Sequence, residues 1–201
     1  MAEVLMTALL QATMVGLVFA RFSVASSRAA TIAFSSCMVT SGESISFRVA
    51  NLRNHQVLRP RVTLFMVHKT RDDDEGDQVV EYKCDELRLT TSSLWLGLPT
   101  VVTHIIDEMS PLKAYWIRGD TGATAAALAE AEAEFVALLD GIEEATSKDV
   151  QARHSWLGDD IKFGHIFKKM ATRRGEDGAL VVDWQHFHAT IRRAQQALDV
   201  I

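Results

Sequence analysis

Ser44-Ile-Ser-Phe-Arg-Val-Ala-Asn51 alternates polar and apolar side chains over most of its length. A period of two puts the apolar side chains on one face of an extended chain, so this stretch predicts a half-buried β-strand. Arg59-Pro-Arg-Val-Thr-Leu-Phe-Met-Val-His-Lys69 continues the alternation. Further strands are predicted over Met38–Thr40, Val79–Cys84, Val101–Ile106, Glu134–Leu139, Val150–Trp156, Lys162–Phe167 and Leu180–Asp183. Many short strands separated by turn signals indicate an all-β fold in which two sheets form a sandwich.

Two stretches have a helical rather than an alternating pattern. Thr124-Ala-Ala-Ala-Leu-Ala-Glu-Ala-Glu-Ala-Glu134 consists almost entirely of strong helix formers and offers a threonine as cap, so it predicts a short helix on the surface of the sandwich. Residues 184–198 predict a terminal helix. Within that stretch, Ile191, Ala194 and Leu198 share one helix face.

The charge balance argues against a nucleic-acid partner. The chain has 21 basic and 26 acidic residues, for a net charge of -5, whereas broad nucleic-acid binding needs a basic face. Its two cysteines, Cys37 and Cys84, are far apart and form no CxxC pair. This spacing favours a reducing compartment.

No motif for catalysis stands out in the sequence. There is no GxSxG, no phosphate-binding loop and no GxGxxG. On a strand, His186-Phe-His188 would point both imidazoles to one side, but no third ligand lies nearby in sequence, so we interpret them as surface or core histidines. We therefore expect no enzyme activity, no catalytic residue and no metal site.

The first twenty residues differ from the rest of the chain. Val4 to Ala20 carries no charge, and Arg21 follows it. The run is slightly shorter than the roughly 20 apolar residues of a full membrane span. It could be a membrane helix, a signal peptide without the usual basic start, or a buried core helix. Thr7 and Gln11 would share a helix face, which suits a water-filled lumen, although such side chains also bond to their own or a neighbouring helix.

Three stretches carry a resemblance to a known family. They are Leu139-Asp-Gly-Ile-Glu-Glu-Ala-Thr146, Gln151-Ala-Arg-His-Ser-Trp156 and His104-Ile-Ile-Asp-Glu-Met-Ser-Pro-Leu112. Further matches in the same order are Phe19-Ala-Arg-Phe22, Arg28-Ala-Ala-Thr-Ile-Ala-Phe-Ser35, Phe47-Arg-Val-Ala-Asn-Leu-Arg53 and Asp159-Asp-Ile-Lys-Phe-Gly-His165. Together they closely resemble the cytoplasmic domain of inward-rectifier potassium channels. The Gln-Ala-Arg-His and Phe-Ala-Arg-Phe strings are most similar to the bacterial branch.

The resemblance implies an architecture of three parts. Residues 1–22 would be the end of the inner, pore-lining transmembrane helix. Residues 23–190 would be a cytoplasmic, immunoglobulin-like β-sandwich, and residues 191–201 a C-terminal helical tail. The resemblance places the protein at a membrane, with its main domain in the cytoplasm.

The resemblance also implies a gate and a lipid contact at the membrane. Phe19 matches the bulky residue at the bundle crossing, where a ring of such side chains can close a pore by dewetting; it could instead only pack on a helix or lipid. Arg21 and Arg28 match the first and last basic lipid contacts, and Arg53 matches a basic position on the membrane-facing loop. The first two could be plain interfacial anchors, and Arg53 a structural pairing residue. Val24-Ala-Ser-Ser27 replaces the Arg-Pro-Lys-Lys of animal channels, which predicts weak phosphoinositide affinity.

Four positions match residues that line the family's pore. Thr7 and Gln11 would face the membrane cavity, and Gln11 stands where strong rectifiers carry an acid. Asp140 matches an acid that faces the cytoplasmic pore, and it could instead be a solvated turn residue. Arg59 falls where strong rectifiers place a second pore-facing acid, so the charge there is reversed.

The Leu139–Thr146 stretch and the residues after it match the loop that narrows the pore mouth. The resemblance places Ile142 and Ser147 in this gating loop. Glu144 and Arg153 match an ion pair at the subunit interface that braces it.

No Thr-x-Gly-Tyr-Gly filter motif occurs in the sequence, so the carbonyl rings that select potassium must come from elsewhere. We expect the regulatory and pore-extension portion of a channel, as a homotetramer or co-assembled with filter-bearing subunits. The expected partners are membrane lipid head groups, with potassium as permeant ion, anionic phospholipid as regulator and no other cofactor. The alternative is a free-standing, non-conducting sandwich that binds proteins or lipids.

Overall fold

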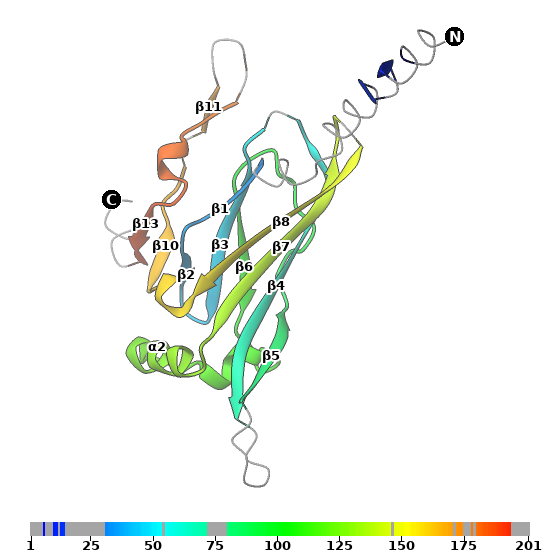
Figure 1. The fold of residues 1–201 in the computed structure, drawn as a ribbon. Helices are drawn as coiled ribbons and strands as arrows, with labels where there is room; N and C mark the ends of the chain where they lie inside the picture. The colour runs from blue at the N-terminus through cyan, green and yellow to red at the C-terminus, as the bar shows by residue number, and fades with distance from the viewer. Residues whose placement is uncertain are drawn as a thin grey trace.

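A computed structural model describes most of the chain. The described residues are 6, 10, 11, 13, 14, 31–53, 55–71, 80–145, 147–170, 172–174, 178 and 180–193. From residue 31 onward, nearly all the secondary structure in these ranges is β-strand, with one named α-helix, Thr121–Glu130 (Figure 1). This confirms the predicted all-β class.

The first sheet is built around β3 (Ser44–Asn51). On one edge β3 pairs antiparallel with β6 (Thr100–Ile105). On its other edge it pairs with β1 (Ile32–Phe34) and β2 (Met38–Thr40). Beyond β2 lies β9 (Ile161–Phe163), which runs parallel to it.

The second sheet has four antiparallel strands in the order β5, β4, β7, β8. Their bounds are β4 Val57–Arg71, β5 Val80–Leu87, β7 Glu134–Glu143 and β8 Lys148–Leu157. The β7 and β8 ribbons run side by side, diagonally, through the middle of the view (Figure 1). The long β7–β8 pairing runs without a register shift from Glu134↔Leu157 to Glu143↔Lys148.

One hydrophobic core lies between the two sheets. Side chains from both sheets are fully or almost fully buried in it, among them Phe47, Leu64, Met66, Phe135 and Trp156. The alternation seen in the sequence therefore does place one face of each central strand against the other sheet. This packing makes the domain a two-sheet sandwich.

An irregular strap, residues 88–94, joins one edge of the first sheet to the second sheet. At one end, the backbone N–H of Thr90 donates to the carbonyl of Thr103 on β6, at 2.9 Å. Further along, the N–H of Val62 on β4 donates to the carbonyl of Ser92, also at 2.9 Å. The strap thus covers an edge at which β6 would otherwise offer its backbone groups to another strand.

The predicted surface helix exists but is shifted toward the N-terminus. Helix α2 spans Thr121–Glu130, and the side chain of Asp120 caps it by accepting a hydrogen bond from the N–H of Ala123. Thr124 is not the cap; its buried hydroxyl donates to the carbonyl of Asp120. The helix ends early because Glu134 already belongs to β7, where pairing with two strands outweighs local helix propensity.

The predicted terminal helix is wrong over its described part. Trp184–His186 forms a single 3-10 turn capped by Asp183, and the chain then forms β13 (Thr190–Arg192). β13 pairs with β10 (His165–Phe167), so tertiary pairing overrides the helical spacing of the apolar side chains. The helical tail predicted from residue 191 therefore starts within a strand, and residues 194–201 lie outside the described residues.

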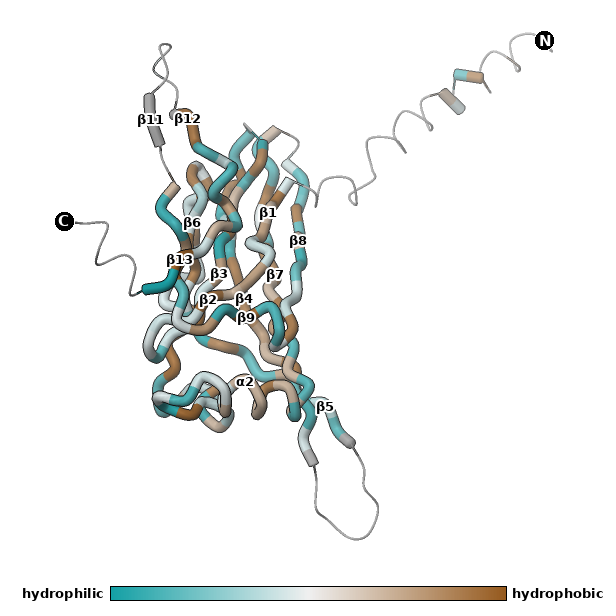
Figure 2. Tube along the Cα trace, turned by 90° about the vertical axis from the view of Figure 1, so that its left-hand side faces the viewer, coloured by the Kyte–Doolittle hydropathy of each residue, from teal (hydrophilic) through white to brown (hydrophobic). Residues whose placement is uncertain are grey.

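Other differences from the predicted strands are small. The single strand predicted over residues 162–167 is split into β9 and β10 at Gly164, whose φ is +69°. Three short strands were missed: β1, β13, and β11 (Thr172–Arg174). β11 pairs antiparallel with β12 (Leu180–Val182), which Figure 2 shows above β13.

Arg48 fastens this C-terminal layer to the first sheet. The guanidinium is almost fully buried and lies 4.7 Å from the centre of the Phe167 ring. It donates hydrogen bonds to three carbonyls, those of Lys168, His186 and Phe187, at 2.8 to 3.0 Å. The planar guanidinium of arginine presents five N–H donors in a fixed arrangement, so it can bond to three acceptors at once. The compact ammonium of lysine matches such a set of acceptors less well.

Replacing Arg48 with Met tests this tie. The variant keeps an apolar stem but leaves three carbonyls without their donor, so we expect a loss of about 3 kcal/mol in unfolding free energy. Urea unfolding measures that loss, and hydrogen exchange should rise in residues 184–193. The control is Arg61→Met, at an exposed arginine. Unchanged exchange in residues 184–193 would show that Arg48 does not hold the C-terminal layer.

Candidate functional site

The predicted gating residues lie at the tip of the β7–β8 hairpin. Ile142 is near the end of β7, half-buried, and pairs in register with Asp149. Ser147 begins the return of the chain; its φ of +52° is left-handed, and its N–H donates to the carbonyl of Glu143 at 2.8 Å. The two residues are thus brought together, and their gating role stays a prediction.

The predicted pore-facing charges lie on the neighbouring part of the same sheet. Asp140 is exposed and accepts a hydrogen bond from the side-chain amide of Gln151 at 2.8 Å. Arg59 lies in a β-bulge of β4, where the register against β7 shifts and φ is +50°. The bulge brings a second exposed arginine, Arg61, directly opposite Asp140.

Sequence reasoning did not single out Arg61. Strict alternation along Arg59-Pro-Arg61 puts both arginines on one side, and that signal was present. The bulge itself was not predictable, because a non-glycine residue with positive φ is uncommon. Arg61, and not Arg59, is the arginine in register with Asp140.

The residues of the predicted ion pair are apart within one chain. Arg153 is exposed and pairs in register with Leu138, five residue pairs from the end of the hairpin. Glu144 instead accepts a hydrogen bond from the backbone N–H of Gln56 at 3.2 Å. An ion pair between Glu144 and Arg153 would therefore have to form between two chains, as the interface prediction requires.

Arg53 makes a different contact from the one predicted for it. Its Nη1 lies 3.6 Å from Oε1 of Glu143, whose side chain is 8% exposed. This is the structural pairing that the sequence left open as an alternative to a lipid contact. Because 47% of the Arg53 side chain is exposed, the pair does not bury the guanidinium.

The predicted sites of the first thirty residues fall mainly outside the described residues. This holds for Thr7, Phe19, Arg21 and Arg28. Gln11 is described; it is helical and exposed, as are residues 6, 10, 13 and 14. Among the described residues, no helix is long and apolar enough to cross a membrane.

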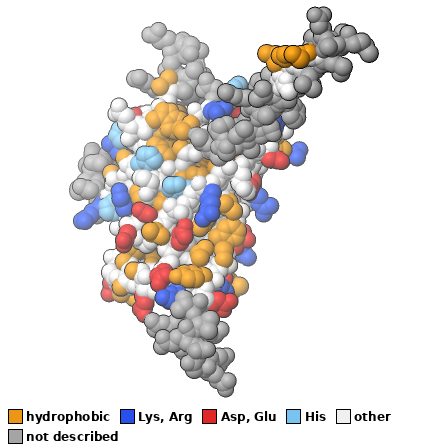
Figure 3. All heavy atoms as spheres, in the orientation of Figure 1, with side chains coloured by type: hydrophobic (Ala, Val, Ile, Leu, Met, Phe, Trp, Pro, Cys, Tyr) orange, Lys and Arg blue, Asp and Glu red, His pale blue; other side chains and the backbone are white. Residues whose placement is uncertain are grey.

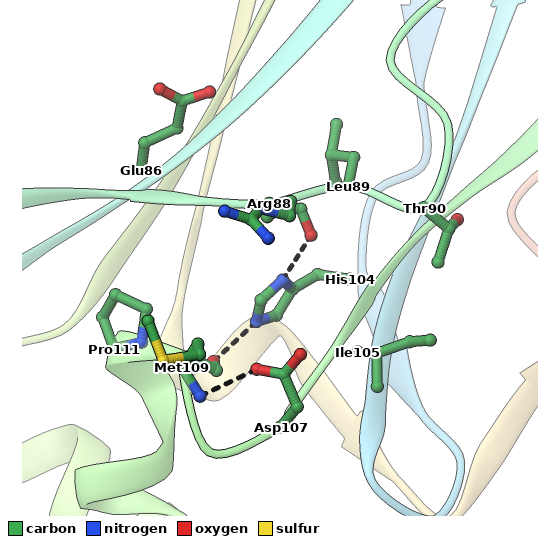
Figure 4. Close-up of a pocket in the computed structure, with 10 residues that line it drawn as sticks. Glu86, Arg88, Leu89, Thr90, His104, Ile105, Asp107, Met109 and Pro111 are labelled. Carbon is green, nitrogen blue, oxygen red and sulfur yellow. Dashed lines mark hydrogen bonds between the residues drawn. The ribbon is translucent and has the colours of Figure 1, made fainter.

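A pocket of about 390 Å³ has a buried histidine in its wall (Figure 4). His104 on β6 donates from Nδ1 to the carbonyl of Arg88 at 2.7 Å, because a carbonyl can only accept. Its Nε2 lies 2.7 Å from the hydroxyl of Ser110, which donates to the neutral ring. Burial lowers the pKa of His104, although the Arg88 carbonyl and the Asp107 carboxylate oppose this shift. The neutral ring ties β6 to two loops.

A second histidine joins three elements at the α2 end of the sandwich. His68 on β4 donates from Nε2 to Asp85 on β5, at 2.9 Å. The hydroxyl of Tyr115 lies 2.9 Å from Nδ1 of the same ring. The hydrogen bond from His68 holds the pKa of Asp85 below its usual range. The order hydroxyl, imidazole, carboxylate is that of a catalytic triad, but His68 is buried at this position and phenols are poor nucleophiles, so we interpret the array as structural.

Two further histidines, His186 and His188, have ordinary polar partners. Among the described residues, no three His, Cys, Asp or Glu side chains are grouped to hold a metal. His186 bonds to Asp183 and Lys168, whereas His188 accepts from the N–H of Ser36. On the face drawn in Figure 3, acidic and basic side chains are interspersed, without a continuous basic band.

By its fold the chain is a domain of the two-sheet β-sandwich class. Residues 27–198 match the family described as the inward rectifier potassium channel C-terminal domain. The chain belongs to this family, as the sequence resemblance predicted.

Three relatives illustrate the match. The chain is 32% identical over 190 residues to inward rectifier potassium channel irk-1 of Caenorhabditis elegans, covering 90% of this chain and 33% of that protein. It is 32% identical over 195 residues to G protein-activated inward rectifier potassium channel 3 of Homo sapiens, covering 94% and 47%. It is 31% identical over 193 residues to ATP-sensitive inward rectifier potassium channel 8 of Mus musculus, covering 92% and 43%. The chain thus spans a third to about half of these relatives, which are channels and not enzymes.

Two histidines with lowered pKa values, His104 and His154, predict that the folded chain loses stability on mild acidification. Burial lowers the pKa of both His104 and His154 in the folded chain. The unfolded chain therefore binds protons first, and stability falls as pH drops through the usual histidine pKa of about 6.5. The lowered carboxylate pKa values of Asp85 and Asp183 act only at more acid pH.

We expect the unfolding free energy from urea titrations to fall between pH 7.5 and 5.5, by at most about 1.4 kcal/mol per pH unit for each histidine. His104→Gln should flatten part of this slope at constant ionic strength. His55→Gln, at an exposed histidine, is the matched control. An equal slope in the His104 variant and the parent would contradict the assignment.

Proposed function

We propose that this chain is the cytoplasmic part of an inward-rectifier-type potassium channel, which extends the pore and regulates it. Its sandwich would be immunoglobulin-like, and it would hang below the membrane from the pore-lining helix. The observation that carries this proposal is the family match over residues 27–198, which includes the whole β7–β8 hairpin. The selectivity filter would come from the pore-bearing part of the same assembly.

Four copies would surround the pore with their β7–β8 hairpins pointing inward. The hairpin suits this role because its tip is braced from its own chain. The backbone of Gln56 exchanges hydrogen bonds with Glu144, and Arg53 pairs with Glu143 just before it. A narrow ring of Ile142 and Ser147 would then keep a defined diameter.

The charges near the pore favour weak rectification. A ring of Asp140 attracts polycations, but each Asp140 has Arg61 opposite it on β4 and Arg59 in the bulge of the same strand. At physiological salt, the field of an exposed charge extends over a Debye length of about 8 Å. The arginines would therefore offset much of the attraction. Gln11, by resemblance in the membrane cavity, adds no charge.

The proposal includes a lipid contact at Arg21, Arg28 and Arg53, with anionic phospholipid as the regulator. Each basic residue near an anionic surface contributes about 1 kcal/mol. The exposed half of Arg53 leaves it able to meet a phosphate while paired with Glu143. Potassium would pass through the assembly as the permeant ion.

Assembly is tested through the predicted interface pair. In Glu144→Ala and Arg153→Ala, each change leaves a charge without its partner at a partly buried interface, and we expect a loss of about 3 kcal/mol in tetramer stability. The double variant should lose less than the sum. Light scattering over a dilution series of the full chain in detergent measures the tetramer fraction.

Glu144→Gln is the matched control, because its amide oxygen can still accept from Gln56 while the charge is gone. It should reproduce the assembly defect and keep the urea midpoint of the sandwich. Additive effects in the double variant would reject the pairing, and monomer alone at high concentration would reject the tetramer.

Rectification is tested by joining residues 1–201 to a filter-bearing pore. We expect shallow spermine block in the parent, because the arginines repel the polycation within about a Debye length. Arg61→Glu should strengthen the block by about tenfold or more, and Arg59→Glu should do so less. Arg88→Glu, the same charge change beside the His104 pocket, is the control. Steep block in the parent that neither change alters would contradict the proposed charge rings.

A further inference from the structure

An exposed tryptophan stands at the end of the sandwich that the N-terminal segment joins. The backbone N–H of Leu52 donates to the carbonyl of Thr31 at 2.7 Å, so the chain preceding β1 joins the body beside Leu52. A pocket of about 270 Å³ at this place is lined by Arg53, His55 and Trp95, among others. Trp95 is 66% exposed and Leu52 is 53% exposed.

The Trp95 indole is held in place rather than free. It lies against Gly97, where an added β-carbon would come within 2.3 Å of the ring atom Cζ2. Glycine thus permits the ring to rest on the backbone on one side while most of its surface faces outward. An apolar ring that is held exposed in one orientation, beside the cationic Arg53, indicates a surface that contacts a partner.

The chemistry of this end matches a membrane interface. Trp is enriched where hydrocarbon meets head groups, because its ring is apolar and its N–H is polar. The preceding stretch, Val4 to Ala20, has no charge. Within it, Met6, Leu10 and Met14 are spaced four apart, are helical, and are each more than 60% exposed. The charge-free stretch therefore shows an open apolar ridge and leads to the end that carries Trp95.

We propose that Trp95 and Leu52 form an interfacial anchor that rests in the head-group region of a lipid bilayer, with Arg53 and His55 facing its anionic head groups. This inference rests on the proposed membrane location and adds an apolar contact to the basic one. The anchor fixes the height of the sandwich below the membrane. Because Arg53 also pairs with Glu143, that height is coupled to the β7–β8 hairpin.

The test uses the full chain in vesicles of phosphatidylcholine and phosphatidylglycerol, with brominated phosphatidylcholine as a quencher of tryptophan fluorescence. We expect Trp95→Phe to lower the quenched signal about twofold, because an interfacial indole meets the bromines. Trp184→Phe, at the other tryptophan that is largely exposed, is the matched control and should change it little. Trp156 is buried and contributes no contact.

Gly97→Ala is the sharpest variant, because its β-carbon must displace the indole while all four tryptophans remain. It should lower the quenching almost as far as Trp95→Phe does. At about 1 M salt the Debye length is only about 3 Å, so attraction through Arg53 is screened, and quenching of Trp95 should persist. Loss of that quenching in salt would overturn the apolar anchor. Equal urea midpoints confirm that the variants fold.

Other results separate this inference from the function on which it rests. If Trp95→Phe leaves quenching unchanged, the indole does not reach the bilayer and the anchor is wrong. If quenching is unchanged and the same variant lowers the tetramer fraction in detergent, Trp95 faces a neighbouring subunit; the anchor is again wrong, but the proposed channel assembly stands. If the full chain does not float with vesicles at all, both proposals fail.

Discussion

A buried serine carries a hydrogen bond between the two sheets within their shared core. Ser35 is fully buried between β1 and β2, and its carbonyl accepts the indole N–H of Trp156 on β8 at 2.8 Å. Its hydroxyl donates to the carbonyl of Cys37 and accepts the N–H of Arg48, while its own N–H donates to the carbonyl of Arg48. Hydrogen bonds in a core of low polarity are costly to break, so this residue fixes the spacing and orientation of the sheets.

The functional ends of the molecule depend on that spacing. The indole of Trp156 contacts Phe47 of the first sheet, with ring centres 5.0 Å apart, and so sets where β8 lies over β3. Arg48, the neighbour of Phe47, carries the C-terminal layer. One cluster therefore positions the long hairpin on one side and the β10–β13 layer on the other. A small rotation of β8 at Trp156 would displace the tip of the β7–β8 hairpin by a larger distance, because the tip lies at the far end of both strands.

The strands and the family could be predicted because both signals are local. Alternation gave β2 and β3 with their observed ends, and the motif around Asp140 placed the hairpin in the right family. Features that depend on distant parts of the chain were not predictable. The strand at Thr190 forms only because β10 is available to pair with it. The pairing of Arg53 with Glu143 joins residues ninety positions apart.

In the candidate site, too, the local features could be predicted from the sequence, whereas those that depend on distant residues could not. The sequence could bring Ile142 and Ser147 together, because they lie on one short loop. It could not show that Arg61 is the arginine opposite Asp140, since the bulge at Arg59 depends on how β4 fits against β7. Nor could it show that Trp95 lies over Gly97 beside Arg53, because that pocket is built from two separate loops.

The parallel pairing of β2 with β9 bears on the order in which the protein is made and folded. Met38 pairs with Ile161, so the first sheet cannot be completed until residues near 163 have left the ribosome. Contacts between such distant residues slow folding, because the entropy of closing a long loop is lost before the contacts contribute any stabilising energy. Until then, one edge of β2 has no neighbour, and an open edge is where strands from different chains join. In the proposed tetramer, nascent chains made close together would share this hazard during the same interval.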